Sequence, residues 1–127
     1  MERYLIDTNI VSGYFSSSFS KTGLDWMDKV IDDVPNISII TQIELLCWQT
    51  DIVTEASIKE FIDDSKIWDI TPEVLNQCVN IRRKKKIKTP DAIIAATALI
   101  NGFIIITNNE KDFRNIKGLK LINPFQL

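Results

Sequence analysis

The sequence predicts a three-layer α/β domain in which a central parallel sheet of about four to five strands has helices on both faces. Short apolar runs alternate along the chain with longer segments whose apolar residues recur at helical spacing. The run 103–106 (FIII) is apolar without alternation, which is typical of a parallel strand that is covered on both sides. The length of 127 residues fits a single domain, 1–127, because no repeat or linker is visible.

The N-terminal part of the chain is expected to contain one strand, a helix start directly after it and one further helix. The apolar run 4–6 predicts a buried strand, and Asp7-Thr8-Asn9 after it is typical of a helix start. A serine-rich loop at 16–20 follows. Apolar residues at helical spacing then predict a helix over 22–34, which ends near Pro35.

The middle of the chain repeats the alternation of strand and helix. The run 37–40 predicts a second strand, and residues 41–48 are expected to form the helix after it. Apolar residues on one face predict another helix over 54–65, and the run 67–70 predicts a third strand. Strands that alternate with helices in this way favour parallel pairing.

The last third of the chain is expected to hold two helices and two strands. Pro72 begins a helix that ends in a basic run at 82–88. Residues 89–100 form a helix that is apolar nearly all round, so we expect it to be buried. The run 103–106 is the fourth strand, and the last strand is expected at 119–122.

The composition excludes several kinds of chemistry. The chain has no histidine, which rules out Ser–His–Asp and Cys–His catalysis and most zinc sites. Its two cysteines, Cys47 and Cys78, are isolated and are most simply interpreted as buried thiols. Catalysis would therefore depend on carboxylates, lysine or arginine, hydroxyl groups or a hard metal ion.

The same composition bears on location and partners. A net charge of −2 and an isoelectric point near 5.1 give no global indication of nucleic-acid binding, although they leave room for a local basic surface. No apolar run approaches the roughly 18 residues of a membrane helix, and the first seven residues do not resemble a signal peptide. We therefore expect a cytoplasmic protein with no membrane partner.

Four acidic residues stand where a local structural role would also explain them. Asp7 ends the first strand and is a good helix N-cap. Glu44 lies three residues after Thr41, which is the spacing of a capping box. Asp91 lies in the first turn of a helix, where a carboxylate suits the helix dipole. Asp112 follows the fourth strand and is uninformative by itself.

Sheet geometry nevertheless brings these acids together. Asp7, Glu44 and the segment 109–112 each come after a strand, and the carboxyl ends of parallel strands share one edge of the sheet. The helix 89–100 and the strand after it have similar lengths of about 17 to 18 Å, so a tight turn between them returns Asp91 to that edge. Converging carboxylates need protonation or a cation. All-oxygen ligands favour Mg²⁺ or Mn²⁺ over zinc.

Taken in order, these motifs resemble those of PIN-domain ribonucleases, and within that group the VapC-like toxins of type II toxin–antitoxin systems. The resemblance covers essentially the whole chain. The motifs that carry it are YLIDTN at 4–9, TQIEL at 41–45, PDAIIAA at 90–96 and ITNNEKDF at 106–113. It implies a PIN-like fold and a Mg²⁺- or Mn²⁺-dependent endoribonuclease that leaves 5′-phosphate and 3′-hydroxyl ends. It also implies an RNA substrate, an antitoxin partner and a homodimer, for which helices near 22–34 and 54–65 would offer the surface.

The resemblance assigns roles to the acidic residues. Asp7 and Asp91 would hold the principal metal, and Glu44 would complete the cluster or orient the attacking water. Many relatives have an aspartate where this chain has Asn109, which ligates only through a neutral amide oxygen, so Asp112 is the candidate fourth acid. The implied reaction is metal-assisted hydrolysis of a phosphodiester bond, which needs no nucleophilic side chain.

Several other side chains have both a structural and a functional interpretation. Thr8 and Thr107 carry hydroxyl groups that would fix the orientation of the carboxylates, although both are also explained as helix caps. Trp26, Trp48 and Trp68 would be able to stack on bases. However, an aromatic residue at a helix or strand position is more often part of the core.

The basic run at 82–88 is the candidate RNA-binding surface. Six of its seven residues are basic, and its last residue lies three positions before Asp91. The run is either a solvated helix end that complements the dipole or a contact for the phosphate backbone. By family analogy, an antitoxin segment would also be able to neutralise it. The candidate RNA-binding residues are Arg82, Arg83, Lys84, Lys85 and Lys88.

Other classes of function stay open from the sequence. A phosphoacceptor receiver domain also has an acidic sheet edge, but it would normally show an acidic pair where this chain has Asp7-Thr8-Asn9. The main alternative is a non-catalytic PIN-like module that binds RNA or a protein, and Asn109 is the residue that keeps it open. Residue types do not separate RNA cleavage from metal-dependent cleavage of structured DNA.

Overall fold

The structure, a computed structural model, describes residues 2–127, so Met1 of the predicted domain 1–127 lies outside the described residues. The described chain contains five short strands: β1 (Tyr4–Ile6), β2 (Asn36–Ser38), β3 (Lys66–Trp68), β4 (Ile104–Ile106) and β5 (Leu121–Ile122). Its helices are α1 (Thr8–Phe15), α2 (Lys21–Asp32), α3 (Ile39–Cys47), α4 (Ile52–Asp64), α5 (Pro72–Lys84), α6 (Thr89–Asn101), α7 (Glu110–Phe113) and the 3₁₀ turn η1 (Pro124–Gln126).

The strands are parallel and form two adjacent sheets. One sheet has the order β1-β4-β5, with Tyr4 opposite Ile104, and the other pairs β2 with β3. β1 and β2 lie next to each other, and the side-chain amide of Asn36 donates to the Tyr4 carbonyl oxygen at 3.3 Å. The single sheet that we expected is therefore divided between β1 and β2, where a side chain forms the bridge.

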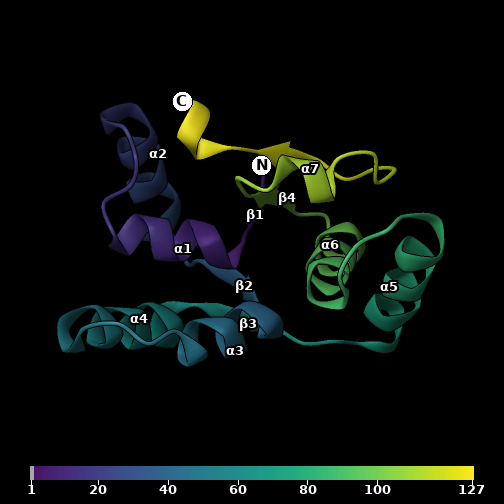
Figure 1. The fold of residues 1–127 in the computed structure, drawn as a ribbon, viewed down its shortest axis with the longest axis horizontal. Coiled ribbons are helices and arrows are strands. Elements are labelled where there is room, and N and C mark those ends of the chain that lie inside the picture. Colours follow the sequence, from purple (N-terminus) through teal and green to yellow (C-terminus); the bar gives the residue numbers. More distant parts are fainter. Residues whose placement is uncertain (1) are drawn as a thin grey trace.

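Alternate residues of the central strands point into two separate apolar layers. Leu5 and Ile105 pack with residues of α5 and α6, whereas Ile6 and Ile106 pack with residues of α1 to α4. All four side chains are fully buried. Figure 1 shows these two groups of helices on opposite sides of the strands. The apolar runs lack alternation because both faces are covered, which confirms the predicted α/β class.

The helix α6 is buried, as its sequence predicted. Six of its residues are buried: Ala92, Ile94, Ala95, Ala96, Thr97 and Ala98. The helix packs against α5 and ends at Gly102, whose φ of 72° is the left-handed conformation that glycine adopts without strain. Although α6 is very apolar, no described helix is both long enough and apolar enough to cross a bilayer.

Several element boundaries differ from the expected ones. The second strand ends at Ser38, and α3 begins at Ile39 instead of Thr41. The cause is local, because the Ser38 hydroxyl accepts a hydrogen bond from the Ile40 N–H and caps the helix. The helix α5 ends at Lys84, so the rest of the basic run is a linker. The four-residue helix α7 was not expected from the sequence.

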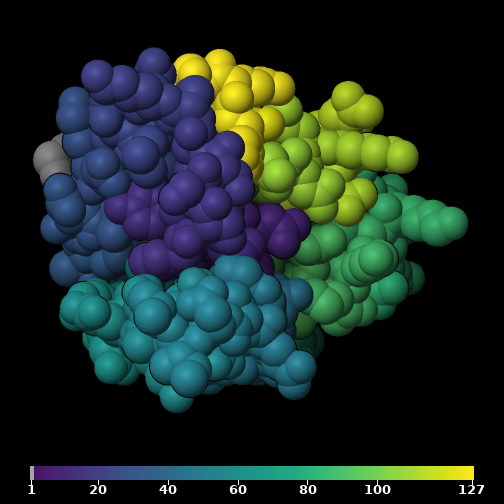
Figure 2. Space-filling view, turned by 60° about the vertical axis from the view of Figure 1, so that its left-hand side comes forward, coloured from purple at the N-terminus to yellow at the C-terminus, as the bar shows by residue number. Residues whose placement is uncertain are grey.

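The C-terminal segment returns to the N-terminal half of the chain. The turn η1 packs against α2, and the ring of Phe125 stacks on that of Phe19 with 4.3 Å between centroids. Gly23 is needed here, because an added Cβ would lie 2.5 Å from the Pro124 carbonyl oxygen. Figure 2 shows the C-terminal residues in yellow lying against the blue and purple residues of the N-terminal helices.

Candidate active site

Four carboxylates form the acidic group: Asp7, Glu44, Asp91 and Asp112. Asp7 is its buried member. It directly follows β1 and caps α1, and only 4% of its surface is exposed. Its Oδ1 accepts a hydrogen bond from the Thr8 N–H and its Oδ2 one from the Thr107 hydroxyl, both at 2.8 Å. Burial is the main reason that the pKa of Asp7 is raised to about 6. Nearby Asp91 and Glu44 also raise this pKa, whereas the two hydrogen bonds lower it.

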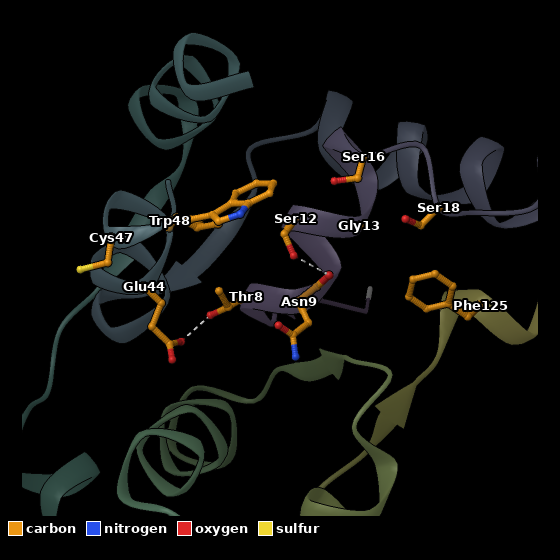
Figure 3. A pocket seen from close by; sticks show the side chains of 11 residues that line it. Thr8, Asn9, Ser12, Gly13, Ser16, Ser18, Glu44, Cys47, Trp48 and Phe125 are labelled. Atoms are coloured by element: carbon orange, nitrogen blue, oxygen red, sulfur yellow. Dashed lines mark hydrogen bonds between the residues drawn. The ribbon is translucent and has the colours of Figure 1, made fainter. Parts of the chain in front are cut away.

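Glu44 is held by Thr8 and not by the start of its own helix. The expected capping box of Thr41 and Glu44 is wrong, because α3 begins earlier and Ser38 is its cap. Thr41 is fully buried inside the helix, with its hydroxyl 3.2 Å from that of Thr8. The Thr8 hydroxyl donates to Glu44 Oε1 at 2.6 Å, as Figure 3 shows. Thr8 therefore contacts Asp7 with its backbone and Glu44 with its side chain.

Asp91 lies in the first turn of α6 and is half-buried. The helix begins after Lys88, and no side-chain hydrogen bond caps it. Burial is the largest cause that raises the pKa of Asp91, followed by the negative charges of Asp112 and Glu44. Lys88 acts in the opposite direction. The effect of these two charges on Asp91 indicates that α6 brings it within electrostatic reach of Asp112 and Glu44.

Asn109 and Asp112 are connected to Asp7 through Thr107 by a chain of hydrogen bonds. The buried Thr107 hydroxyl donates to Asp7 and accepts the Asn109 backbone N–H at 3.0 Å. The Asn109 side-chain amide donates to Asp112 Oδ2 at 2.9 Å. Asn109 thus holds the fourth acid by a hydrogen bond that an aspartate at this position would be unable to donate.

The chemistry of this group suits a hard divalent cation. In residues 2–127, the hydrogen bonds to Asp7, Glu44 and Asp112 come from neutral donors. Oxygen ligands of this kind fit Mg²⁺ or Mn²⁺. Within the same residues, however, no three acidic side chains are close enough to enclose an ion. Metal binding would therefore require the exposed Glu44 and the half-buried Asp91 to turn inward.

The basic run spans the end of α5 and the linker to α6. Three of its cations occupy the last turn of α5, where they suit the helix dipole. Arg82 Nε donates to the Ile87 carbonyl oxygen at 3.1 Å, which folds the linker back onto the helix. The five predicted RNA-binding residues are exposed except for the half-buried Lys85. Lys88 is close enough to Asp91 to lower its pKa.

A cavity of about 640 Å³ opens beside the acidic group, and sequence reasoning did not predict it. Thr8 and Glu44 line it together with Trp48 and Phe125, as seen in Figure 3. It forms where α1 meets α3, so only tertiary packing defines it. The one sequence signal is a set of polar residues at helical spacing along α1 and at its C-terminal cap: Asn9, Ser12 and Ser16.

The fold and this site define a class of protein: a parallel α/β domain with an acidic group where β1 and β4 end, in a chain without histidine. Residues 4–119 match the PIN domain family. The chain belongs to this family, as its four sequence motifs predicted.

Solved structures with this fold include chains from toxin–antitoxin complexes. A chain in a toxin-antitoxin complex from Klebsiella pneumoniae is 29% identical, with a TM-score of 0.78, over 98% of this chain and 99% of that chain. DNA-bound VapBC from Salmonella typhimurium has a chain that is 20% identical, with a TM-score of 0.79 and the same coverage of 98% and 99%. FitAcB from Neisseria gonorrhoeae has one that is 22% identical, with a TM-score of 0.77, again over 98% and 99%. The last two similarities show the fold alone. No curated protein matches this chain significantly.

Proposed function

We propose that this chain is a metal-dependent endoribonuclease and the toxin of a toxin–antitoxin pair. PIN domains are typically nucleases. The observation that carries the proposal is Asp7, a buried carboxylate that is held by neutral donors and whose pKa is raised mainly by burial and further by the charges of Asp91 and Glu44. A helix cap alone does not explain why further acids gather around a buried one. A divalent cation explains it, because it offsets their repulsion.

Each acidic residue has a role in this proposal. Asp7 and Asp91 would hold the principal ion, and Glu44 would complete the cluster or orient the attacking water. Asp112 and the amide oxygen of Asn109 would contribute to a second position. When bound, Mg²⁺ or Mn²⁺ supplies positive charge against the phosphate and makes a water molecule more acidic.

The two threonines would position the carboxylates before substrate arrives. Thr107 holds Oδ2 of Asp7, so the rotation of that buried carboxylate is fixed by a strand end. Thr8 holds Glu44, which is otherwise exposed to solvent. Hydrogen bonds of this kind orient metal ligands and tune their basicity. The attacking group is water, which agrees with a chain that lacks histidine.

RNA would reach the site along the basic run. The five predicted RNA-binding residues follow the end of α5 toward Asp91, and we assign them to the phosphate backbone. Contacts of this type give affinity that falls with salt but little choice of sequence. We therefore expect RNA binding despite the net charge of −2.

We propose two protein partners, an antitoxin and a second copy of this chain. The antitoxin follows from the similarity to chains in toxin–antitoxin complexes. Self-association is supported by exposed apolar side chains on α3 and at the start of α4. They are Ile43, Leu46, Ile52 and Val53. These four side chains extend the predicted dimer surface on α4 to include α3. Light scattering of the purified chain would measure its state of association.

The direct test is incubation of the purified chain with end-labelled single-stranded RNA, in Mg²⁺ or Mn²⁺ and in EDTA. Asp7→Asn and Asp91→Asn each remove one proposed ligand. Asp63→Asn is the matched control, because it removes an exposed carboxylate from α4. Cleavage that requires metal, survives in the control and disappears in the two ligand variants would support the nuclease.

Other outcomes identify the alternatives. RNA binding without cleavage, in the presence or absence of metal, would favour the binding module. Cleavage of structured DNA and not of RNA would change the substrate class. Equal cleavage by Asp91→Asn would contradict the proposed ligand set. Activity is to be measured on the chain after any co-purified protein has been removed.

A further inference from the structure

We propose that the cavity between α1 and α3 binds an unstacked nucleobase of the RNA strand, with Trp48 as the stacking surface. This inference rests on the proposed ribonuclease function and adds a base-binding position to the same site. Four observations carry it: the place of the cavity, its charge, its size and the state of the Trp48 indole.

The cavity is continuous with the acidic group. Thr8 and Glu44 line the end of the cavity nearest the acids and are joined by the hydrogen bond of 2.6 Å. The Thr8 backbone N–H in turn contacts the Asp7 carboxylate. A phosphodiester held at these acids would therefore place an adjacent nucleotide at the mouth of the cavity. Figure 3 shows the cavity extending from Thr8 and Glu44 toward Phe125.

The charge of the lining favours the neutral part of a nucleotide. Glu44 is the only carboxylate among the lining residues, and they include no lysine or arginine. A phosphate would meet repulsion here without a compensating cation. The basic run instead lies at the end of α5, which Figure 1 shows on the far side of α6 from α1 and α3. The backbone and the base would thus occupy opposite flanks of the acidic group.

The size and polarity of the cavity suit a base with its ribose. Its volume of about 640 Å³ lies in the range of small-molecule pockets, and the cavity is open to solvent along one side. The Asn9 amide on α1 and the Ser16 hydroxyl at its C-terminal cap are available as neutral donors and acceptors, whereas the Ser12 hydroxyl donates to the Asn9 carbonyl oxygen and is left as an acceptor. Such groups bind base edges or ribose hydroxyls, and they do not require a particular base.

Trp48 packs against the same apolar cluster as Trp26, but it differs from the other two tryptophans in the partners of its indole ring. Trp68 donates its indole N–H to Asn36, and the ring of Trp26 packs edge-on against Tyr4. In residues 2–127, Trp48 has neither an acceptor for its indole N–H nor an aromatic neighbour. Figure 3 shows its ring extending from α3 toward Ser12 across the cavity. A half-buried aromatic face in this position is a stacking surface for a base.

The test compares Trp48→Leu, which removes the aromatic face, with Trp48→Phe, which keeps one. Trp26→Leu is the control, because Trp26 is also half-buried but lines a different cavity. Cleavage of a single-stranded RNA of about ten nucleotides is measured with Mn²⁺ on the intact strand and on strands with one abasic position each. Thermal melting confirms that each variant is folded.

We expect Trp48→Leu to lower kcat/KM about tenfold, mainly through KM, whereas Trp48→Phe and Trp26→Leu stay within about threefold of the wild type. One abasic position is expected to lower wild-type cleavage to a similar extent and to have no further effect on Trp48→Leu. This lack of additivity is the readout that a merely structural tryptophan would not produce.

Several results would overturn the inference. If the wild type cleaves RNA while Trp48→Leu is unimpaired, or is impaired equally on every abasic strand, the base site is wrong and the nuclease stands. If Trp48→Leu instead loses only the binding of a co-expressed protein partner, the cavity is a protein site. A wild type that neither binds nor cleaves RNA overturns the proposed function and this inference together.

Discussion

The Thr107 hydroxyl donates a buried hydrogen bond of 2.8 Å to Asp7 Oδ2, although 100 residues separate the two in the sequence. Both residues directly follow paired parallel strands, because Ile6 and Ile106 are opposite each other in β1 and β4. The register of the sheet therefore sets the rotation of the Asp7 carboxylate. The same hydroxyl accepts the Asn109 N–H, so it connects three candidate site residues.

Removing this hydroxyl is expected to reduce both stability and activity. Thr107→Val leaves Asp7 Oδ2 and the Asn109 N–H without their partner, which costs about 1 to 3 kcal/mol in the free energy of unfolding. Cleavage is expected to fall by about tenfold or more, because the carboxylate loses its orientation. Urea unfolding in EDTA and RNA cleavage in Mn²⁺ measure the two effects.

Two further variants separate the hydroxyl from general packing. Thr107→Ser keeps the hydroxyl and is expected to retain most of the activity. Thr97→Val also removes a buried threonine hydroxyl, but one that bonds to the Ile93 carbonyl within α6. It should leave cleavage unchanged. A Thr107→Val protein with full activity would show that this hydrogen bond is structural only.

The raised pKa of Asp7 makes the stability of the metal-free protein depend on pH. A carboxyl whose pKa is 3.8 when unfolded and about 6 when folded favours the folded state at low pH, and that stability is lost as the pH rises through 6. We expect the ionisation of Asp7 to lower the free energy of unfolding by roughly 2 to 3 kcal/mol between about pH 4 and about pH 7.

The comparison with Asp7→Asn isolates this effect, because the amide does not titrate. The difference in unfolding free energy between wild type and variant, measured in EDTA, should shift in favour of the variant as the pH rises from about 4 to about 7. A difference that is constant over this range would mean that the Asp7 pKa is not raised. Asp63→Asn controls for the loss of a carboxylate elsewhere.

A divalent ion is expected to offset the loss of stability that the ionised Asp7 carboxylate causes at neutral pH. Millimolar Mn²⁺ should raise the melting temperature of the wild type at neutral pH by about 5 °C or more, because it binds the folded state preferentially. Asp91→Asn should reduce this rise, and its metal-free form should be at least as stable as the wild type, because a repelling charge is gone. An identical response to Mn²⁺ in both proteins would argue against Asp91 as a ligand.

Much of the fold could be predicted because strong local patterns agree with the tertiary structure. The apolar run before Asp7 and the predominantly apolar α6 are long or uniform enough to be assigned from sequence. The start of α3 was misplaced because Ile37-Ser38-Ile39-Ile40 fits either a strand or a helix. The helix α7 has only four residues, too few to show a periodicity.

The candidate site was predictable as a set of strand-end acids but not as a network. Sheet topology alone places Asp7 and the segment after β4 on one edge. The bond from Thr8 to Glu44, by contrast, depends on how α1 packs on α3, and no local pattern encodes that packing. The capping-box spacing even favoured a wrong partner for Glu44. The cavity beside Trp48 was missed for the same reason, since it exists only between two packed helices.

Asn109 offers the most informative single substitution. In the metal-free protein, its amide donates to Asp112 at 2.9 Å, so Asn109→Asp replaces a hydrogen bond with two facing carboxylates. We expect the metal-free variant to lose about 1 to 3 kcal/mol of stability at neutral pH and to recover it at low pH, where the pair shares a proton.

The added charge of Asn109→Asp should at the same time increase the affinity of the chain for Mn²⁺, measured by titration calorimetry. Asn108→Asp, at the neighbouring exposed position, is the matched control. Tighter metal binding with faster cleavage in Asn109→Asp alone would place position 109 at the metal, whereas unchanged affinity would restrict Asn109 to holding Asp112.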